Sequence, residues 1–401
     1  MSEAPEAQWL TIVGIGEDAP DGLPPASLAA LGAAEIVMGA PRHLALLPSV
    51  EAELVTWPVP FADGIETLLK YRGRRTVALA SGDPFWFGAG TSITRQIVAG
   101  EWTAIPVPSI FSQVAARMGW PLEQTSCLGL HAAPLGRLRP ALAQGARLIV
   151  LLRDGAAVSA LAEYLASTGF GASRLNIFEA VGGPRARHSL ATADTLSSAQ
   201  FSHPVCAAIE VSGCPALPLA GGRPDAWFES DGQMTKRPIR ALTLSALAPQ
   251  VGEHLWDIGG GSGSIAVEWL LAHPSLAATS IEPRADRAVR IAENAARLGV
   301  DRLRVVQNAA PDALTDLPRP EAVFIGGGLS TDLLGWLGAH LAAGTRIVAN
   351  AVTLESEAVL IAAQARHGGD LMRIELAQAA PIGARTGWKS SYPVVQWSAI
   401  L

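Results

Sequence analysis

The sequence predicts an α/β protein with two different domains, and three observations lead to this fold class. The chain has 401 residues, which is enough for two domains that each bury a core. Apolar residues make up 49% and charged residues 16%, a balance typical of large buried sheets rather than of a disordered chain. Short apolar strands alternate with helical patterns on both sides of a Pro/Gly-rich segment at 214–224, where all periodicity stops.

The second half has the more regular pattern. Strands are predicted at about 254–259, 277–282, 302–307, 321–326 and 345–350. Helices are predicted between them, at about 264–272, 284–297, 331–339 and 355–366. This alternation predicts a parallel, doubly wound sheet of the Rossmann-like kind with right-handed crossovers. Two final strands, at about 370–378 and 392–400, have no helix between them and predict an antiparallel hairpin at one sheet edge.

The first half has its own α/β pattern. Strands are predicted at about 9–16, 35–39, 75–80, 103–107, 147–152, 174–179 and 204–211. Helices are predicted at about 25–31, 111–118 and 157–167. No internal repeat relates the halves, so we expect two unrelated folds: a domain at 1–213, a linker at 214–229 and a domain at 230–401.

The most informative motif is the strand, glycine turn and helix start at 254–264, His-Leu-Trp-Asp-Ile-Gly-Gly-Gly-Ser-Gly-Ser. Glycines are needed where backbone passes close under a ligand, and a helix N-terminus offers free N–H groups. Glu282, at the end of the next strand, is suited to accepting both hydroxyls of a ribose. Ala309 and Ala310, after the third strand, allow close approach of an adenine edge.

Asp257, just before the glycines, decides between two cofactors. A carboxylate there would repel the pyrophosphate of a dinucleotide, but it can accept hydrogen bonds from a cationic amino acid tail, directly or through water. The motif therefore favours S-adenosylmethionine (SAM) over NAD. An NAD-dependent oxidoreductase using the 254–264 loop is the alternative, and a glycine turn without a ligand is the plain structural interpretation. Phe324-Ile-Gly-Gly-Gly-Leu329 stands where an enzyme that methylates bases has Asn/Asp-Pro-Pro-Tyr/Phe, so base methylation is disfavoured.

The first half carries a second motif, Ser81-Gly-Asp-Pro-x-x-x-Gly88, directly after a predicted strand. Gly82 permits a tight turn, Asp83 supplies a carboxylate, Pro84 stiffens the loop and Gly88 allows the next helix to approach. A ligand-binding turn and an ordinary strand-to-helix turn are both consistent with these residues.

Residues from about 230 to 400 resemble the precorrin C15-methyltransferase/decarboxylases of the cobalamin pathway. The likeness is carried by residues 231–244, by the glycine loop, and by Ile281-Glu-Pro283, Asn308-Ala-Ala-Pro311, Phe324-Ile-Gly-Gly327 and Asn350-Ala-Val-Thr-Leu-Glu355. The resemblance implies a SAM site made by Thr235, Asp257, Gly259, Gly260, Gly261, Ser262, Gly263, Glu282 and Ala310. The family usually has a different small residue at Gly260.

Residues 9 to about 213 resemble the tetrapyrrole methylases, in which SAM lies folded between two α/β subdomains. Gly14-x-Gly16, the 81–88 motif and Val107-Pro-Ser-Ile-Phe-Ser112 carry this likeness. Segments 130–134, 151–155 and 178–188 are similar to the precorrin C5-methyltransferase branch. The resemblance implies a second SAM site made by Gly16, Gly82, Asp83, Pro84, Gly88 and Ser109. Gly16-Glu17-Asp18 departs from the family's usual Gly-Pro-Gly.

In this order the halves resemble the precorrin-6Y C5,15-methyltransferase (decarboxylating) family. The resemblance implies methylation of precorrin-6B at C5 and C15 and decarboxylation of its C12 acetate to give precorrin-8, with one SAM site in each domain. A SAM methyltransferase for another small molecule, or one whose first half only regulates, is a further alternative.

A precorrin carries many carboxylates, so scattered cations should bind it. Lys236, Arg240 and Arg185 are the candidates, with solvated surface charges as the plain interpretation. Asn350 and Glu355 are candidate catalytic residues, although a strand-end turn residue and a first-turn helix carboxylate are also normal there.

Charge, cysteine content and hydropathy restrict the partners and the cellular location to be expected. The net charge of −6 argues against nucleic acid as a partner, and three cysteines without metal-ligand spacing predict no metal site and a reducing cytoplasm. The acidic start at 1–6 lacks the order of a signal peptide, and no apolar run is long enough for a membrane span. Both families named above tend to assemble, which implies a homo-oligomer.

Overall fold

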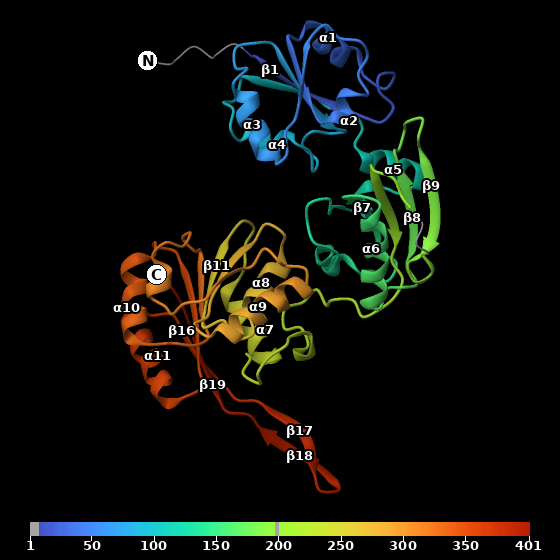
Figure 1. Ribbon diagram of the computed structural model, residues 1–401. Coiled ribbons are helices and arrows are strands. Elements are labelled where there is room, and N and C mark those ends of the chain that lie inside the picture. The colour runs from blue at the N-terminus through green and yellow to red at the C-terminus, as the bar shows by residue number, and fades with distance from the viewer. Residues whose placement is uncertain (1–7, 197–199) are drawn as a thin grey trace, which may run out of the picture. The chain divides into compact units, whose positions relative to one another are not determined.

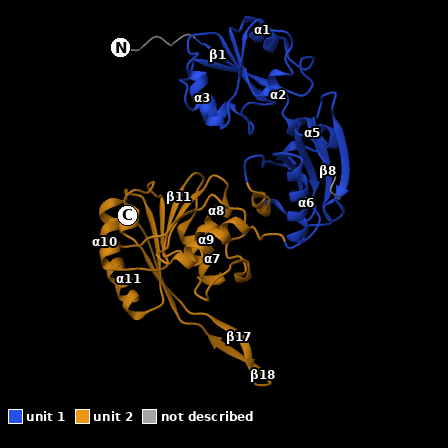
Figure 2. Cartoon of the chain, viewed as in Figure 1, with its two compact units in different colours: residues 1–133, 141–215 blue, residues 134–140, 216–401 orange. Residues whose placement is uncertain are grey.

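A computed structural model describes residues 8–196 and 200–401. The chain divides into two compact units (Figure 2): unit 1 holds residues 1–133 and 141–215, and unit 2 holds residues 134–140 and 216–401. The short segment 134–140, which the sequence placed inside the first domain, packs with unit 2. The acidic residues 1–6 lie outside the described part of the chain.

The first sheet of unit 1 is entirely parallel, with the order β3-β2-β4-β1-β5 (Figure 1). Its strands are β1 (Leu10–Ile15), β2 (Ile36–Gly39), β3 (Glu53–Thr56), β4 (Thr76–Ser81) and β5 (Trp102–Ile105). The helices between them are α1 (Pro25–Ala33), α2 (Pro41–Leu44), α3 (Phe61–Leu69) and α4 (Gly90–Thr94). The central strands read as continuous apolar runs because helices cover a parallel sheet on both faces.

The second sheet of unit 1 is mixed, with the order β6-β7-β10-β8-β9 and only β6 and β7 parallel. Its strands are β6 (Ser126–Gly129), β7 (Arg147–Leu152), β8 (Arg174–Glu179), β9 (Arg187–Thr192) and β10 (Val205–Glu210). The helices are α5 (Ile110–Met118) and α6 (Ala156–Ser167). β3, β6 and β9 were not predicted, because these outer strands have few buried side chains and therefore lack a clear apolar pattern.

Unit 2 contains a seven-stranded sheet with the order β13-β12-β11-β14-β15-β19-β16. The parallel strands are β11 (His254–Ile258), β12 (Ala277–Ile281), β13 (Arg304–Val306), β14 (Ala322–Ile325) and β15 (Arg346–Ala351). The helices are α7 (Arg237–Leu247), α8 (Ser264–Ala272), α9 (Ala285–Arg297), α10 (Thr331–His340) and α11 (Leu354–His367). The predicted fold class, an α/β chain with a Rossmann-like second half, is confirmed; α7 was not predicted.

The predicted antiparallel edge is present, with one addition. β19 (Val394–Ile400) pairs antiparallel with both β15 and β16 (Asp370–Ile374), so it lies between them. Between these strands the chain forms a separate two-stranded ribbon, β17 (Ala377–Ile382) and β18 (Arg385–Ser390), which Figure 1 shows extending from the sheet. The ribbon was not predicted because most of its side chains are exposed and its sequence has no apolar alternation.

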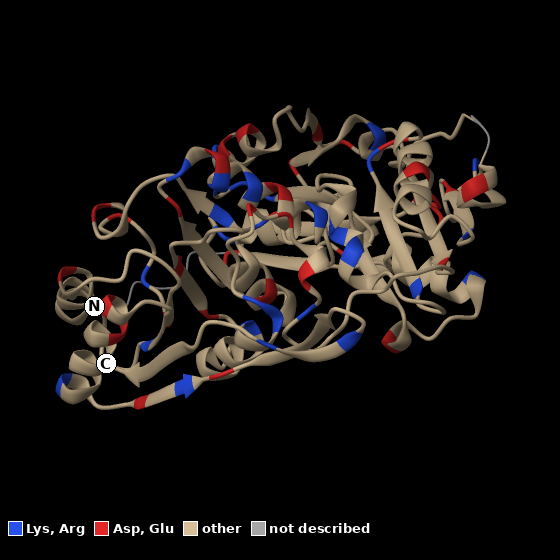
Figure 3. Ribbon diagram, turned by 90° about the horizontal axis from the view of Figure 1, so that it is seen from below, with Lys and Arg blue, Asp and Glu red and all other residues tan. Residues whose placement is uncertain are grey.

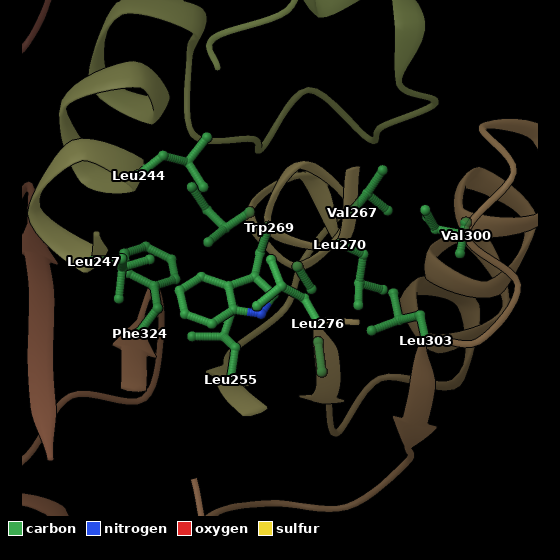
Figure 4. Close-up of a cluster of buried hydrophobic side chains, with 14 of the residues drawn as sticks. Leu244, Leu247, Leu255, Val267, Trp269, Leu270, Leu276, Val300, Leu303 and Phe324 are labelled. Carbon is green, nitrogen blue, oxygen red and sulfur yellow. The ribbon is translucent and has the colours of Figure 1, made fainter. Parts of the chain in front are cut away.

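The core of unit 2 packs α7 and α8 against the sheet. Figure 4 shows Trp269 of α8 between Leu244 and Leu247 of α7 and the strand residues Leu255 and Phe324. Such burial of large apolar side chains contributes about 1.5–3 kcal/mol each. The packing fixes the start of α8, and with it the glycine turn that precedes this helix.

Positively and negatively charged residues are interspersed along the chain, as Figure 3 shows. Among the described residues, no helix is both long and apolar enough to cross a membrane.

Candidate functional sites

Unit 2 holds a cavity of about 1620 Å³ at the carboxyl ends of β11, β12 and β14. Parallel sheets place ligands at this end of their strands, because the connecting loops and helix N-termini meet there. Among its lining residues are predicted site residues from five segments: Thr235, Lys236, Gly259, Gly260, Gly261, Ser262, Glu282, Ala310 and Asn350.

Backbone conformation and close packing require glycine at several positions of the 259–263 turn. Gly259, Gly261 and Gly263 have φ angles of 72°, 60° and 73°, in the left-handed region that side chains disfavour. A Cβ on Gly259 would also lie 2.6 Å from the backbone nitrogen of Gly327. A Cβ on Gly260 would overlap the hydroxyl of Ser280, so the glycine at this position suits the packing of this chain. The turn therefore brings bare backbone to the cavity.

Two polar side chains of the turn region face the cavity. Glu282 is 3% exposed, and its carboxylate accepts hydrogen bonds from the Gly261 N–H at 2.9 Å and the Arg284 N–H at 3.0 Å. These bonds fix the carboxylate and leave lone pairs for a ligand. The buried hydroxyl of Ser262 has no hydrogen-bond partner among the described residues. An orphaned hydroxyl in the lining of a cavity indicates a place for a polar ligand atom.

Asp257 lies beneath the turn. Its side chain is 1% exposed and is not among the residues that line the cavity, and its contact with a ligand stays a prediction. The carboxylate accepts a hydrogen bond from the Ser280 hydroxyl at 3.2 Å, beneath the turn. Burial raises the pKa of Asp257 to about 7. Asp257 therefore supports the glycine turn from below.

Arg240 requires a correction. It is completely buried, and its guanidinium lies 2.6 Å from Glu268 and 3.0 Å from Asp225. It also donates to the carbonyl oxygen of Thr235. With every side of the guanidinium occupied, Arg240 cannot bind a substrate carboxylate. It anchors the segment that carries Thr235 and Lys236 into the cavity.

A second anchor for that segment was missed. Arg287 of α9 donates to Asp231 at 2.8 Å and to Gln233 at 2.6 Å. Both Arg287 and Gln233 line the cavity. Only the alternation of charges around residue 231 and along α9 hinted at this contact, because 56 residues separate the partners Asp231 and Arg287.

The two predicted catalytic residues have different surroundings. Asn350, at the end of β15, lines the cavity. Glu355 is exposed in the first turn of α11 and is not among the lining residues. Its prediction is corrected to a helix-start carboxylate, which the helix dipole favours.

Unit 1 holds a cavity of about 820 Å³ between its two sheets. The predicted residues in its lining are Gly16, Gly82, Asp83, Gly88 and Ser109. The Asp83 carboxylate accepts from the Phe85 N–H at 2.9 Å, and the Ser109 hydroxyl caps α5 by accepting from Ser112 N–H at 3.1 Å. Pro84 is corrected: it is buried behind the loop, where its carbonyl oxygen would lie 2.6 Å from a Cβ on Gly88.

A polar cluster in the same cavity was missed. Glu17 forms ion pairs with Arg42 and, at 3.0 Å, with Arg185. Arg42 and His43 each lie within hydrogen-bonding distance of the Ser81 hydroxyl, at 3.0 and 2.9 Å. Burial, with the nearby Arg42 charge, lowers the pKa of His43 to about 3. Arg185, predicted to bind substrate, lies beside the lining residue Glu17 and outside the lining itself.

Comparisons with known proteins match both halves. Residues 9–196 match the family model described as tetrapyrrole (corrin/porphyrin) methylases, and residues 226–401 match the precorrin methyltransferase domain. The precorrin-6Y C(5,15)-methyltransferase [decarboxylating] of Sinorhizobium is 49% identical and covers 97% of this chain and 96% of its own. A cobalt-precorrin-6B C(15)-methyltransferase (decarboxylating) of Salmonella typhimurium is 35% identical over 40% of this chain and 85% of its own.

The second half is also similar to a solved structure. The C-terminal domain of precorrin-6Y C5,15-methyltransferase from Rhodobacter capsulatus is 57% identical, with a TM-score of 0.45. It covers 46% of this chain and 100% of its own.

Proposed function

The chain belongs to the precorrin-6Y C5,15-methyltransferase (decarboxylating) family, and we propose that it methylates precorrin-6B at C5 and C15 and decarboxylates the C12 acetate to give precorrin-8. The product of each methylation carries a methyl group from SAM, with one SAM site in each unit. The observation that carries the proposal is the pair of separate cavities, one per unit, each lined by a glycine-containing turn that follows a parallel strand.

We assign C15 methylation and decarboxylation to unit 2. The Salmonella relative, named for these two reactions alone, is shorter than this chain, which supports dividing the activities between units. Thr235, Gly259, Gly260, Gly261, Ser262, Glu282 and Ala310 line the cavity and would hold SAM, with Glu282 accepting from the ribose hydroxyls; Gly263 lies outside the lining and caps the start of α8. The orphaned Ser262 hydroxyl and the glycine cradle fit such a polar ligand.

The cavity of unit 2 exceeds the roughly 300–1,000 Å³ of a site for one drug-sized ligand. This volume supports simultaneous binding of SAM and a tetrapyrrole. Lys236 and Lys389 lie in the lining and would pair with substrate carboxylates. SAM supplies an electrophilic methyl group, so the contribution of the protein is to align the ring carbon with it and to exclude water.

We assign C5 methylation to unit 1. Gly16, Gly82, Asp83, Gly88 and Ser109 would hold the second SAM molecule. Arg42 and His43, with the hydroxyl of Ser81 between them, offer hydrogen-bonding groups to the substrate in the same cavity. A homo-oligomer in the cytoplasm stays a prediction from the sequence and the family.

The test is mass spectrometry of the tetrapyrrole after incubation of the full chain with SAM and precorrin-6B. The expected product carries two added methyl groups and has lost one carbon dioxide, with two SAM molecules consumed per tetrapyrrole. A tetrapyrrole of unchanged mass, with SAM intact, would overturn the proposal and reopen methylation of another small molecule.

A further inference from the structure

Three polar side chains from three elements meet beneath the cavity of unit 2. Asn350 on β15 and Gln396 on β19 are directly paired across the two strands, and Thr243 of α7 lies against both. Thr243 is 0% exposed and Gln396 3% exposed, whereas Asn350 is half-buried and lines the cavity. Neither Thr243 nor Gln396 is among the lining residues.

The hydrogen bonds of this cluster have one consistent set of directions. The Thr243 hydroxyl has one hydrogen, and it donates this hydrogen to the Ile239 carbonyl at 2.8 Å. The Thr243 oxygen can therefore only accept from the amides, from Asn350 Nδ2 at 2.9 Å and from Gln396 Nε2 at 3.1 Å. The second Gln396 hydrogen goes to Asn350 Oδ1 at 2.9 Å.

These directions fix which way the Asn350 amide faces. A rotation of the amide by half a turn would place its oxygen against the Thr243 oxygen and its nitrogen against the Gln396 nitrogen, and neither pair could form a hydrogen bond. In the fixed orientation one Nδ2 hydrogen is used by Thr243, and the other has no acceptor within the described part of the chain. Since Asn350 is the member of the cluster that lines the cavity, this unused hydrogen is a donor for a ligand there.

We propose that Thr243 and Gln396 are positioning residues that hold the Asn350 amide so that its free N–H binds a carboxylate that the substrate retains. A donor to the carboxylate that leaves would stabilise the starting state and slow decarboxylation, so a retained side-chain carboxylate is the suitable partner. The inference rests on the proposed function, because it takes the substrate of unit 2 to be a polycarboxylate tetrapyrrole.

The kinetic signature follows from this role. A hydrogen bond made equally in the bound substrate and in the transition state affects KM and leaves kcat unchanged. Loss of one hydrogen bond to a charged group should raise KM for the tetrapyrrole about ten- to hundredfold. SAM affinity and C5 methylation in unit 1 should stay the same.

The experiment measures carbon dioxide release from precorrin-6B by the full chain, with Thr243→Val, Thr243→Ser and Asn350→Ala. Valine keeps the shape of threonine but removes the hydroxyl oxygen that accepts from Asn350, so KM for the tetrapyrrole should rise. Serine keeps the hydroxyl, so Thr243→Ser should have the KM of the wild type. Thr243→Val combined with Asn350→Ala should be no worse than Asn350→Ala alone, because Thr243 acts through Asn350. Gln396→Met, which removes the other partner at similar length, should repeat the Thr243→Val result.

Several outcomes would overturn the inference. One is a KM for Thr243→Val equal to that of the wild type; another is a further rise in KM when Thr243→Val is added to Asn350→Ala. A loss of SAM affinity that parallels the rise in KM would assign the cluster to general support of the fold. Absence of carbon dioxide release by the wild-type chain would instead refute the proposed function, which keeps the two failures distinct.

Discussion

The cavities of the two units are built in different ways. In unit 2 the lining is built around a turn in which three alternate glycines have positive φ, and the buried charged pair of Arg240 and Glu268 lies outside the lining. In unit 1 the lining includes a polar cluster of Glu17, Arg42, His43 and Ser81 in which the charged groups face the cavity itself. The cavity of unit 2 combines bare backbone with side chains such as Glu282 and Lys236, whereas the cavity of unit 1 holds a cluster of side chains that are bonded to one another.

The difference shows how two unrelated folds can bring a ligand to the end of a parallel strand. Unit 2 needs buried charges to hold the segment that carries Thr235 and Lys236 over the glycine turn. In unit 1 the two sheets themselves form the walls of the cavity. Damage to the networks of unit 2 should therefore affect its fold first. Damage in unit 1 should affect its cavity first.

The largest effect is expected for Glu268→Gln. Glu268 is 1% exposed and accepts from the buried side chains of Arg240 and Arg223, as well as from the backbone N–H groups of Gly222 and Arg223. The substitution leaves the buried Arg223 without its counter-charge and leaves Arg240 with Asp225 alone, which should lower the free energy of unfolding of unit 2 by about 3–5 kcal/mol. Hydrogen exchange resolved by peptide would report each unit separately.

The control is Glu357→Gln, which removes a carboxylate 3.5 Å from the half-exposed Arg373 in the same unit. A solvent-screened pair should contribute about 0–1 kcal/mol. Equal effects of the two substitutions, or a loss of stability in unit 1, would contradict the view that unit 2 depends on its buried network.

The second prediction compares one glycine in each unit. Gly259→Ala would push a Cβ against the backbone of Gly327, and Gly14→Ala would push one against the backbone oxygen of Gly82. Each added Cβ displaces the wall of the cavity in its own unit, and a displacement of about 1 Å can lower the rate of the reaction there about a hundredfold. We therefore expect Gly259→Ala to reduce C15 methylation and carbon dioxide release about a hundredfold, and Gly14→Ala to reduce C5 methylation by a similar factor.

Matched controls exist for both glycines. Gly252 has a φ of 88° with open space around a Cβ, so Gly252→Ala tests backbone strain without a clash. Gly32 in α1 is similarly open, and its φ is not positive. Both control variants should keep full activity. If Gly14→Ala stopped carbon dioxide release, or Gly259→Ala stopped C5 methylation, the two cavities would not work independently.

The predictable part of these sites is local in the sequence. The 254–264 turn and Glu282 follow strand ends, and spacing alone was enough to bring them into one cavity. Charge without burial information was misleading: Arg240 and Glu355 look alike as polar residues near motifs, yet one is completely buried and the other is exposed. Thr243 and Gln396 were not predictable, because 153 residues separate them and only the packing of α7 on the sheet edge joins them.

The last prediction is that a change in pH alters the stability of the two units in opposite directions. The pKa of Asp257 is raised by burial to about 7, above its unfolded value of 3.8. Its contribution to the stability of unit 2 is therefore complete below pH 3.8 and is lost as the pH rises through 7. The pKa of His43 is lowered to about 3 from 6.5, so its contribution to unit 1 is complete above pH 6.5 and is lost as the pH falls through 3.

Between about pH 4 and pH 6, acidification should stabilise unit 2 and destabilise unit 1, each by about 1.4 kcal/mol per pH unit from these groups. Other groups titrate in the same range, so the contrast is measured against variants that do not titrate. Peptide-resolved hydrogen exchange across this range measures how the stability of each unit changes with pH. Asp257→Asn should reduce this pH dependence in unit 2, and His43→Gln should reduce it in unit 1. A wild-type slope equal to that of the variant in either unit would show that the buried group titrates as if exposed, and the contrast between the units would then fail for that group.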